Sequence, residues 1–156
     1  MIQRIQTLYF FIALLLVCST LFGFDIFSVK LDELGTRTFD ISAFHISESG
    51  NAFRNSTLWI YSAVAALTLI ITIATFKSRE KQITLAKMAI LIVLLVSGWF
   101  VVMGYQFLSK SEFPKNHGVI LGTGFYLFAS SIVFILLGLR GVQKDKKLID
   151  SVNRIR

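Results

Sequence analysis

The chain has 156 residues, of which 54% are hydrophobic, and a formal net charge of +7. Its apolar residues gather in four blocks separated by polar segments, which is typical of a multi-pass membrane protein rather than a soluble domain. The basic residues lie at the edges of these blocks without a nucleic-acid-binding motif, so nucleic acid is not an expected partner. The single cysteine, Cys18, excludes an internal disulfide and paired-thiol chemistry.

The first apolar block covers residues 8–24 and follows the basic residue Arg4. A basic start before an apolar run also begins a secretory signal peptide. No small-x-small cleavage site follows this block, and three further apolar blocks do. We therefore predict a retained membrane-spanning helix rather than a cleaved signal.

Residues 25–57 form the only sizeable polar segment between two blocks. Within it, residues 26–31 and 38–46 crudely alternate apolar and polar side chains, and residues 32–35 supply turn residues. This pattern predicts a small extracytoplasmic β-hairpin, followed by a loop over residues 47–56. Because a lone hairpin is marginally stable in water, we expect it to pack on the helix ends or on a partner.

The remaining apolar blocks cover residues 58–76, 85–108 and 119–139. Each is close to the roughly 20 residues that cross about 30 Å of hydrocarbon as an α-helix. The predicted fold class is therefore all-α integral membrane. Residues 1–156 are expected to form a single domain, a four-transmembrane-helix bundle.

Two glycines four residues apart, Gly118 and Gly122, stand at the start of the fourth block. Small residues at this spacing let helices approach closely in lipid. Two interpretations remain open, namely packing within this bundle and contact with another subunit.

The polar tail, residues 140–156, is predicted to be a C-terminal amphipathic helix. Its apolar residues share one helical face: Leu148, Ile149, Val152 and Ile155. Asp150 and Arg154 are four residues apart in the favoured acid-first order. The tail either lies on the surface of an anionic membrane leaflet or docks on a protein partner.

The orientation follows from the 16 lysine and arginine residues, because basic residues concentrate in cytoplasmic segments. Most of them fall before the first block, between the second and third blocks, and in the tail. We therefore predict that the N-terminus, the C-terminus and the tail are cytoplasmic.

No ionisable residue lies in the middle of any apolar block, which counts against a proton-coupled pump or an ion exchanger. The two histidines, His45 and His117, fall outside the blocks, and no His, Cys or acid cluster has metal-ligand spacing. No nucleotide-binding or catalytic motif occurs either. We expect no catalytic residue, metal or cofactor, and a non-enzymatic protein.

The two ends of the chain carry a family resemblance. Residues 1–9 read MIQRIQTLY, and residues 144–156 read KDKKLIDSVNRIR. With four predicted spans in so short a chain, the sequence resembles a family of small bacterial inner-membrane proteins catalogued only as a domain of unknown function. The resemblance implies a bacterial cytoplasmic (inner) membrane location and no assigned activity.

Because both distinctive ends are predicted to be cytoplasmic, the first residues of the chain are expected to meet the last ones, including Asn153. The candidate partner or packing contacts are Gln3, Arg4, Gln6, Gly118, Gly122, Asp150, Arg154 and Arg156. We expect a non-enzymatic accessory or structural subunit of a larger inner-membrane assembly, in contact with membrane lipids and another inner-membrane protein. The alternative is a small transporter or lipid-handling protein.

Overall fold

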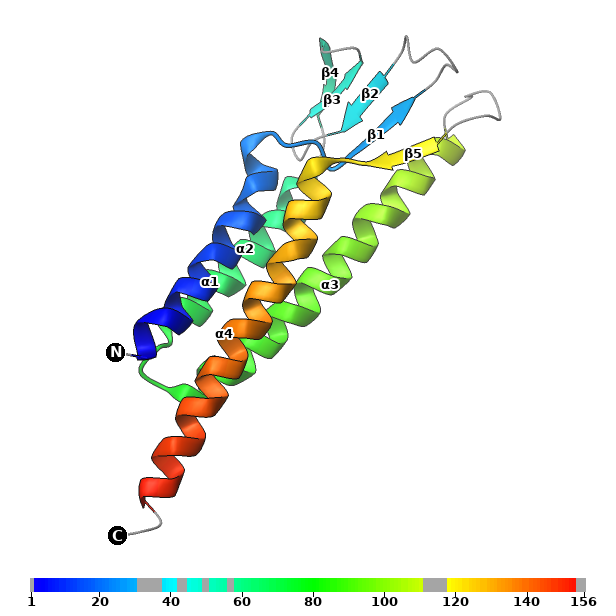
Figure 1. The fold of residues 1–156 in the computed structure, drawn as a ribbon. Helices are drawn as coiled ribbons and strands as arrows, with labels where there is room; N and C mark the ends of the chain where they lie inside the picture. Colours follow the sequence, from blue (N-terminus) through cyan, green and yellow to red (C-terminus); the bar gives the residue numbers. More distant parts are fainter. Residues whose placement is uncertain are drawn as a thin grey trace.

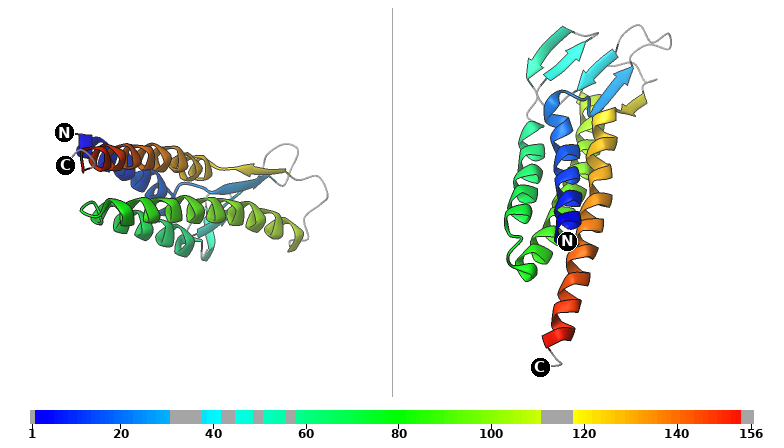
Figure 2. Two further views of the ribbon diagram at one scale, coloured as in Figure 1. Left: turned by 90° about the horizontal axis from the view of Figure 1, so that it is seen from below. Right: turned by 60° about the vertical axis from the view of Figure 1, so that its left-hand side comes forward.

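In the part of the chain that the computed structural model describes, four α-helices lie side by side and carry a β-sheet at one end (Figure 1). Both termini lie at the other end, and α4 extends beyond the rest of the bundle there (Figure 2). We call this second end the terminal end. The described residues are 2–30, 38–41, 45–48, 51–55, 58–110 and 118–153.

The predicted apolar blocks are confirmed as helices. They are α1 (Ile2–Ser19), which continues as a 3-10 turn, η1 (Thr20–Phe22), α2 (Trp59–Ala74), α3 (Arg79–Lys110) and α4 (Thr123–Asn153). Among the described residues, three segments are long and apolar enough to cross a membrane: Ile5–Phe22, Arg79–Gln106 and Thr123–Ile149. Only 28%, 28% and 33% of their apolar windows are buried, so most of these residues are at least partly exposed, as in a protein surrounded by lipid.

Helix α2 is the short member of the bundle. Its 16 residues span about 24 Å at about 1.5 Å per residue, less than the roughly 30 Å of a hydrocarbon core. The helix ends at Ala74, where the backbone N–H of Thr75 donates to the carbonyl oxygen of Ile71, and a tight turn leads into α3. The second predicted block, residues 58–76, is therefore too long at its C-terminal end.

The sheet is larger than the predicted hairpin. It has five antiparallel strands in the order β4-β3-β2-β1-β5 within the described residues. The strands are β1 (Phe27–Lys30), β2 (Thr38–Ile41), β3 (His45–Glu48), β4 (Asn51–Asn55) and β5 (Gly118–Leu121). The hairpin β1–β2 is present as predicted, whereas the predicted loop over residues 47–56 is wrong because much of it belongs to β3 and β4.

Strand β5 corrects the start of the fourth block. Residues 119–121 were predicted to begin a span, but they pair with β1, and Val119 lies opposite Val29. Two backbone hydrogen bonds of 2.9 Å continue this contact, from Gly122 to the carbonyl oxygen of Ile26 and from Gly124 to that of Asp25. Apolar composition does not distinguish a β-strand from a buried helix end, and the partner strand lies far away in sequence.

Helix α4 also corrects the tail. The tail is helical as predicted, but it does not form a separate helix. All 31 residues of α4 form one unbroken helix, about 46 Å long at about 1.5 Å per residue. The fourth block ends at Leu139, and the same helix continues without a turn into Arg140, the first basic residue of the tail.

The four helices form a closed ring, because α1 packs on α4 and α2, and α3 packs on α4 and α2. Three phenylalanines, Phe10, Phe100 and Phe128, fill the core, and the rings of the last two are 5.4 Å apart. Two glycines bring α1 close to α4. A Cβ atom would lie 2.8 Å from the ring of Phe10 if added at Gly138, and 2.7 Å from Cγ of Gln6 if added at Gly141.

Candidate functional site

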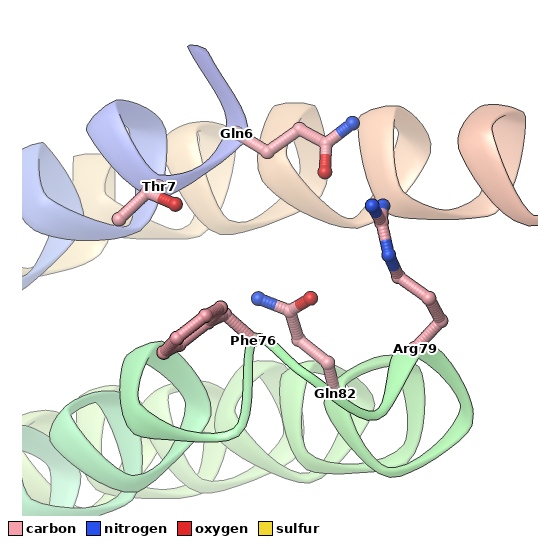
Figure 3. Close-up of a pocket in the computed structure, with 5 residues that line it drawn as sticks. All are labelled: Gln6, Thr7, Phe76, Arg79 and Gln82. Carbon is pink, nitrogen blue, oxygen red and sulfur yellow. The ribbon is translucent and has the colours of Figure 1, made fainter. Parts of the chain in front are cut away.

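Polar side chains from three helices meet inside the terminal end of the bundle, and Figure 3 shows those of α1 and α3. This polar layer consists of Gln6 on α1, Arg79 and Gln82 on α3, and Asp145 on α4. Gln6 and Gln82 are each 4% exposed, and Asp145 is 9% exposed. Buried polar groups need partners, so the layer imposes strict requirements on how the helices pack.

Asp145 is the centre of the layer. Its Oδ2 atom accepts a hydrogen bond of 2.6 Å from Nε2 of Gln6 and one of 2.9 Å from Nη1 of Arg79. The second contact is also an ion pair, in which the Arg79 side chain is 17% exposed. A nearly buried carboxylate is stable only when charge and hydrogen bonds compensate for the lost water. Asp145 therefore ties α4 to both of its neighbours, α1 and α3.

Gln82 extends the layer to the remaining helix. Its Nε2 donates a long hydrogen bond of 3.5 Å to the carbonyl oxygen of Thr72 near the end of α2. At this distance the bond is weak. All four helices are nevertheless connected through polar contacts at the terminal end.

A second ion pair lies next to the layer on the surface. Nζ of Lys146 donates to Oε1 of Glu80 over 2.8 Å, and the Glu80 side chain is 80% exposed. On α3 the basic Arg79 is followed by the acidic Glu80, and on α4 the acidic Asp145 is followed by the basic Lys146. Each of these side chains thus pairs with one of opposite charge on the other helix, which sets the relative position of the two helices.

Local sequence explains how the layer forms. Arg79 is the first residue of α3, directly after the turn from α2. Gly141 leaves room for the side chain of Gln6, and Asp145 lies one helical turn further along α4 on the same side. The close approach of α1 and α4 therefore brings the Gln6 amide within hydrogen-bonding distance of the Asp145 carboxylate.

A small cavity borders the layer and is lined by Gln6, Thr7, Phe76, Arg79 and Gln82 (Figure 3). Its volume of about 30 Å³ is enough for water but far below the roughly 300 Å³ or more of a ligand pocket. Within the described ranges, no group of three or more His, Cys, Asp or Glu side chains could hold a metal ion. The chemistry that this site supports is polar attachment of helices.

Comparison with known proteins assigns the chain to a family. Residues 2–155 match the family described as Domain of unknown function (DUF4293). The chain belongs to this family. The match confirms the resemblance to a domain of unknown function and covers nearly the whole chain. No curated protein matches the sequence.

In this family member, the structure shows a partner for one predicted contact residue. Gln6 donates to Asp145, while the side chains of the last residues, which Gln6 was expected to meet, lie outside the described part. Gln3 and Arg4 belong to α1 and Asp150 to α4, but their side chains lie outside the described part. Arg154 and Arg156 lie outside the described residues altogether.

The two predicted glycines lie at the sheet end instead of on a helix face. Gly118 is in β5, opposite Lys30 of β1. A Cβ atom at Gly122 would overlap the carbonyl oxygen of Asp25, so this glycine allows close approach of two backbone segments of the same chain.

Sequence reasoning did not single out Arg79, Gln82 or Asp145. A signal was available for Asp145, which is an acid among the lysines Lys144, Lys146 and Lys147. The sequence does not show which helical turns lie at the same level, because this depends on how the antiparallel helices are offset. Arg79 was therefore interpreted only as a marker of orientation.

Proposed function

We propose that this chain is a multi-pass protein of the bacterial cytoplasmic (inner) membrane and a non-enzymatic accessory or structural subunit of a larger membrane assembly. The observation that carries this proposal is the course of α4. The helix passes the polar layer without a break and exposes Leu148 by 51% and Ile149 by 49% beyond it.

The basic residues suggest where the membrane ends. If the polar layer lies among the lipid headgroups, α4 covers about 32 Å between Thr123 and Lys144, close to one hydrocarbon thickness. Lys144 and Lys147, both exposed, then lie at the cytoplasmic face, in agreement with the preference of basic residues for this side. The exposed pair Leu148 and Ile149 would lie beyond the headgroups.

This arrangement favours a docked tail over a tail that lies on the membrane. A surface helix would have to turn sharply away from the span, and α4 has no such turn. Asp145, one turn before Ile149, is attached to α1 and α3, which fixes the direction of the helix. Exposed apolar side chains on a rigid helix in water indicate a protein contact.

The alternative function as a small transporter or lipid-handling protein needs a passage or a lipid cavity. Phe10, Phe100 and Phe128 are buried in the centre of the bundle, and the cavity at the polar layer is large enough only for water. These observations give the alternative no support.

Native purification tests the proposal. The chain is tagged at its N-terminus, expressed at its normal level and extracted gently, and the co-purifying proteins are quantified by mass spectrometry. We expect a stoichiometric membrane protein partner with the wild type and with the conservative control L148M/I149V, and its loss with L148S/I149S. Recovery of the wild type as a lone monomer or homo-oligomer would contradict the proposal.

A further inference from the structure

The acidic side chains described at the terminal end are engaged within the bundle. Asp145 pairs with Arg79, and Glu80 pairs with Lys146. The exposed basic side chains there include Lys144 and Lys147 on α4. The described surface of the tail therefore carries positive charge.

These charges and the apolar residues occupy different faces of α4. Arg140, Lys144 and Lys147 recur at intervals of four and three residues and share one face of the helix. Leu148 lies about 100° around the axis from Lys147, next to this row, and Ile149 lies about 200° from Lys147, nearly opposite the row, at about 100° per residue. Both apolar side chains are about half exposed. The end of α4 therefore carries a short apolar stripe, Leu148 and Ile149, which the basic row borders on the Leu148 side.

We propose that the end of α4, residues 144–151, docks as a helix in an apolar groove of a protein partner whose rim carries carboxylates. This inference rests on the proposed function and adds the chemistry of the partner. Leu148 and Ile149 supply the apolar anchors, in the manner of other helix-in-groove contacts. Lys144 and Lys147 face the acidic rim, which steers association and excludes partners with a basic rim.

An anionic bilayer offers the same combination of apolar interior and negative charge. The direction of α4 disfavours it, because the polar contacts of Asp145 hold the helix along the bundle axis before the apolar stripe begins. Because the helix continues away from the membrane, the side chains of the apolar stripe are accessible to a protein and not to the lipid. The protein groove is therefore the occupant to which the geometry points.

Photo-crosslinking in living cells tests this inference. A benzophenone amino acid replaces Leu148 in the full chain, and a second variant carries it at Leu95, which is 65% exposed on α3, as a lipid-facing control. We expect a protein adduct only from position 148, with the crosslinked peptide of the partner rich in Asp or Glu. The charge reversal K144E/K147E should lower the adduct yield by roughly tenfold, whereas K144R/K147R should not.

A matched control separates tail charge from total charge. Lys77 and Lys81 are exposed at the same end but belong to the connection before α3 and to α3 itself. The variant K77E/K81E changes the net charge equally and should leave the adduct intact. A lipid adduct alone, or a protein adduct that is insensitive to K144E/K147E, would overturn the inference. If native purification yields a partner and position 148 gives no protein adduct, the proposed function stands and this inference fails.

Discussion

Asp145 connects three helices through one oxygen atom, because Oδ2 accepts from both Gln6 and Arg79. Its carboxylate is nearly buried, and Arg79 supplies the compensating charge. The exposed Lys146–Glu80 pair beside it is of a different kind, since water screens it. The two pairs allow a direct comparison of a buried and an exposed ion pair at the same helix contact.

Breaking the buried pair should destabilise the protein strongly. Arg79→Gln leaves the Asp145 carboxylate without its charge partner, and we expect a loss of about 3 kcal/mol in the free energy of unfolding. Asp145→Asn should cause a smaller loss of about 2 kcal/mol, because the Arg79 side chain is partly exposed to water. Unfolding in detergent micelles measures both values.

The double variant and an exposed control test the cause. If the two residues act as a pair, R79Q/D145N should lose less stability than the sum of the single variants. Glu80→Gln should leave the unfolding transition unchanged. Equal effects of Glu80→Gln and Asp145→Asn would show that burial does not matter here.

At the scale of elements, the junction between β5 and α4 depends on close backbone approach. Gly122 and Gly124 both donate to the chain segment that leads from η1 to β1. A Cβ atom at Gly122 would overlap the carbonyl oxygen of Asp25, and the backbone there has no flexible end that could move aside. This contact joins the two polar segments of the chain into one sheet.

Gly122→Ala should therefore destabilise the protein by about 1–3 kcal/mol, as overpacking of a tight contact does. Gly98→Ala is the matched control, because nothing lies within 4 Å of a Cβ atom there. Alanine at this position in α3 should be neutral or stabilising by up to about 1 kcal/mol through its higher helix propensity. Thermal unfolding of both variants in the same detergent measures the difference in stability. Equal unfolding midpoints for the two variants would contradict a tight backbone contact at Gly122.

The sequence predicts these elements unevenly, for a physical reason. Long apolar blocks identify helices because each helix satisfies its own backbone hydrogen bonds locally. Strand β5 and the pair β3–β4 were missed, since strands are specified by partners elsewhere in the chain. The polar layer was missed for the same reason, because Gln6 and Asp145 are 139 residues apart. Only Gln6 of its members was predicted as a contact residue.

At the scale of the whole molecule, the ring of helices has a sheet at one end and the polar layer at the other (Figure 1). The outward side chains of the long helices are apolar, as expected for contact with lipid. Among the described helices, α4 extends beyond the rest of the bundle at the terminal end (Figure 2). The shape therefore combines a helical bundle with one helix, α4, that continues past the end of the others.

The most direct test of this account is the depth of α4 in a bilayer. Spin labels are placed one at a time at Leu136, Leu137, Leu148 and Ile149 in a Cys18→Ala background. The purified chain is reconstituted in nanodiscs of phosphatidylethanolamine and phosphatidylglycerol, and accessibility to oxygen and to a water-soluble nickel complex is measured for each label. The account predicts oxygen access at Leu136 and Leu137, and nickel access at both Leu148 and Ile149. Labels at Leu148 and Ile149 that are oxygen-accessible and shielded from nickel would show a tail embedded in the membrane and contradict the account.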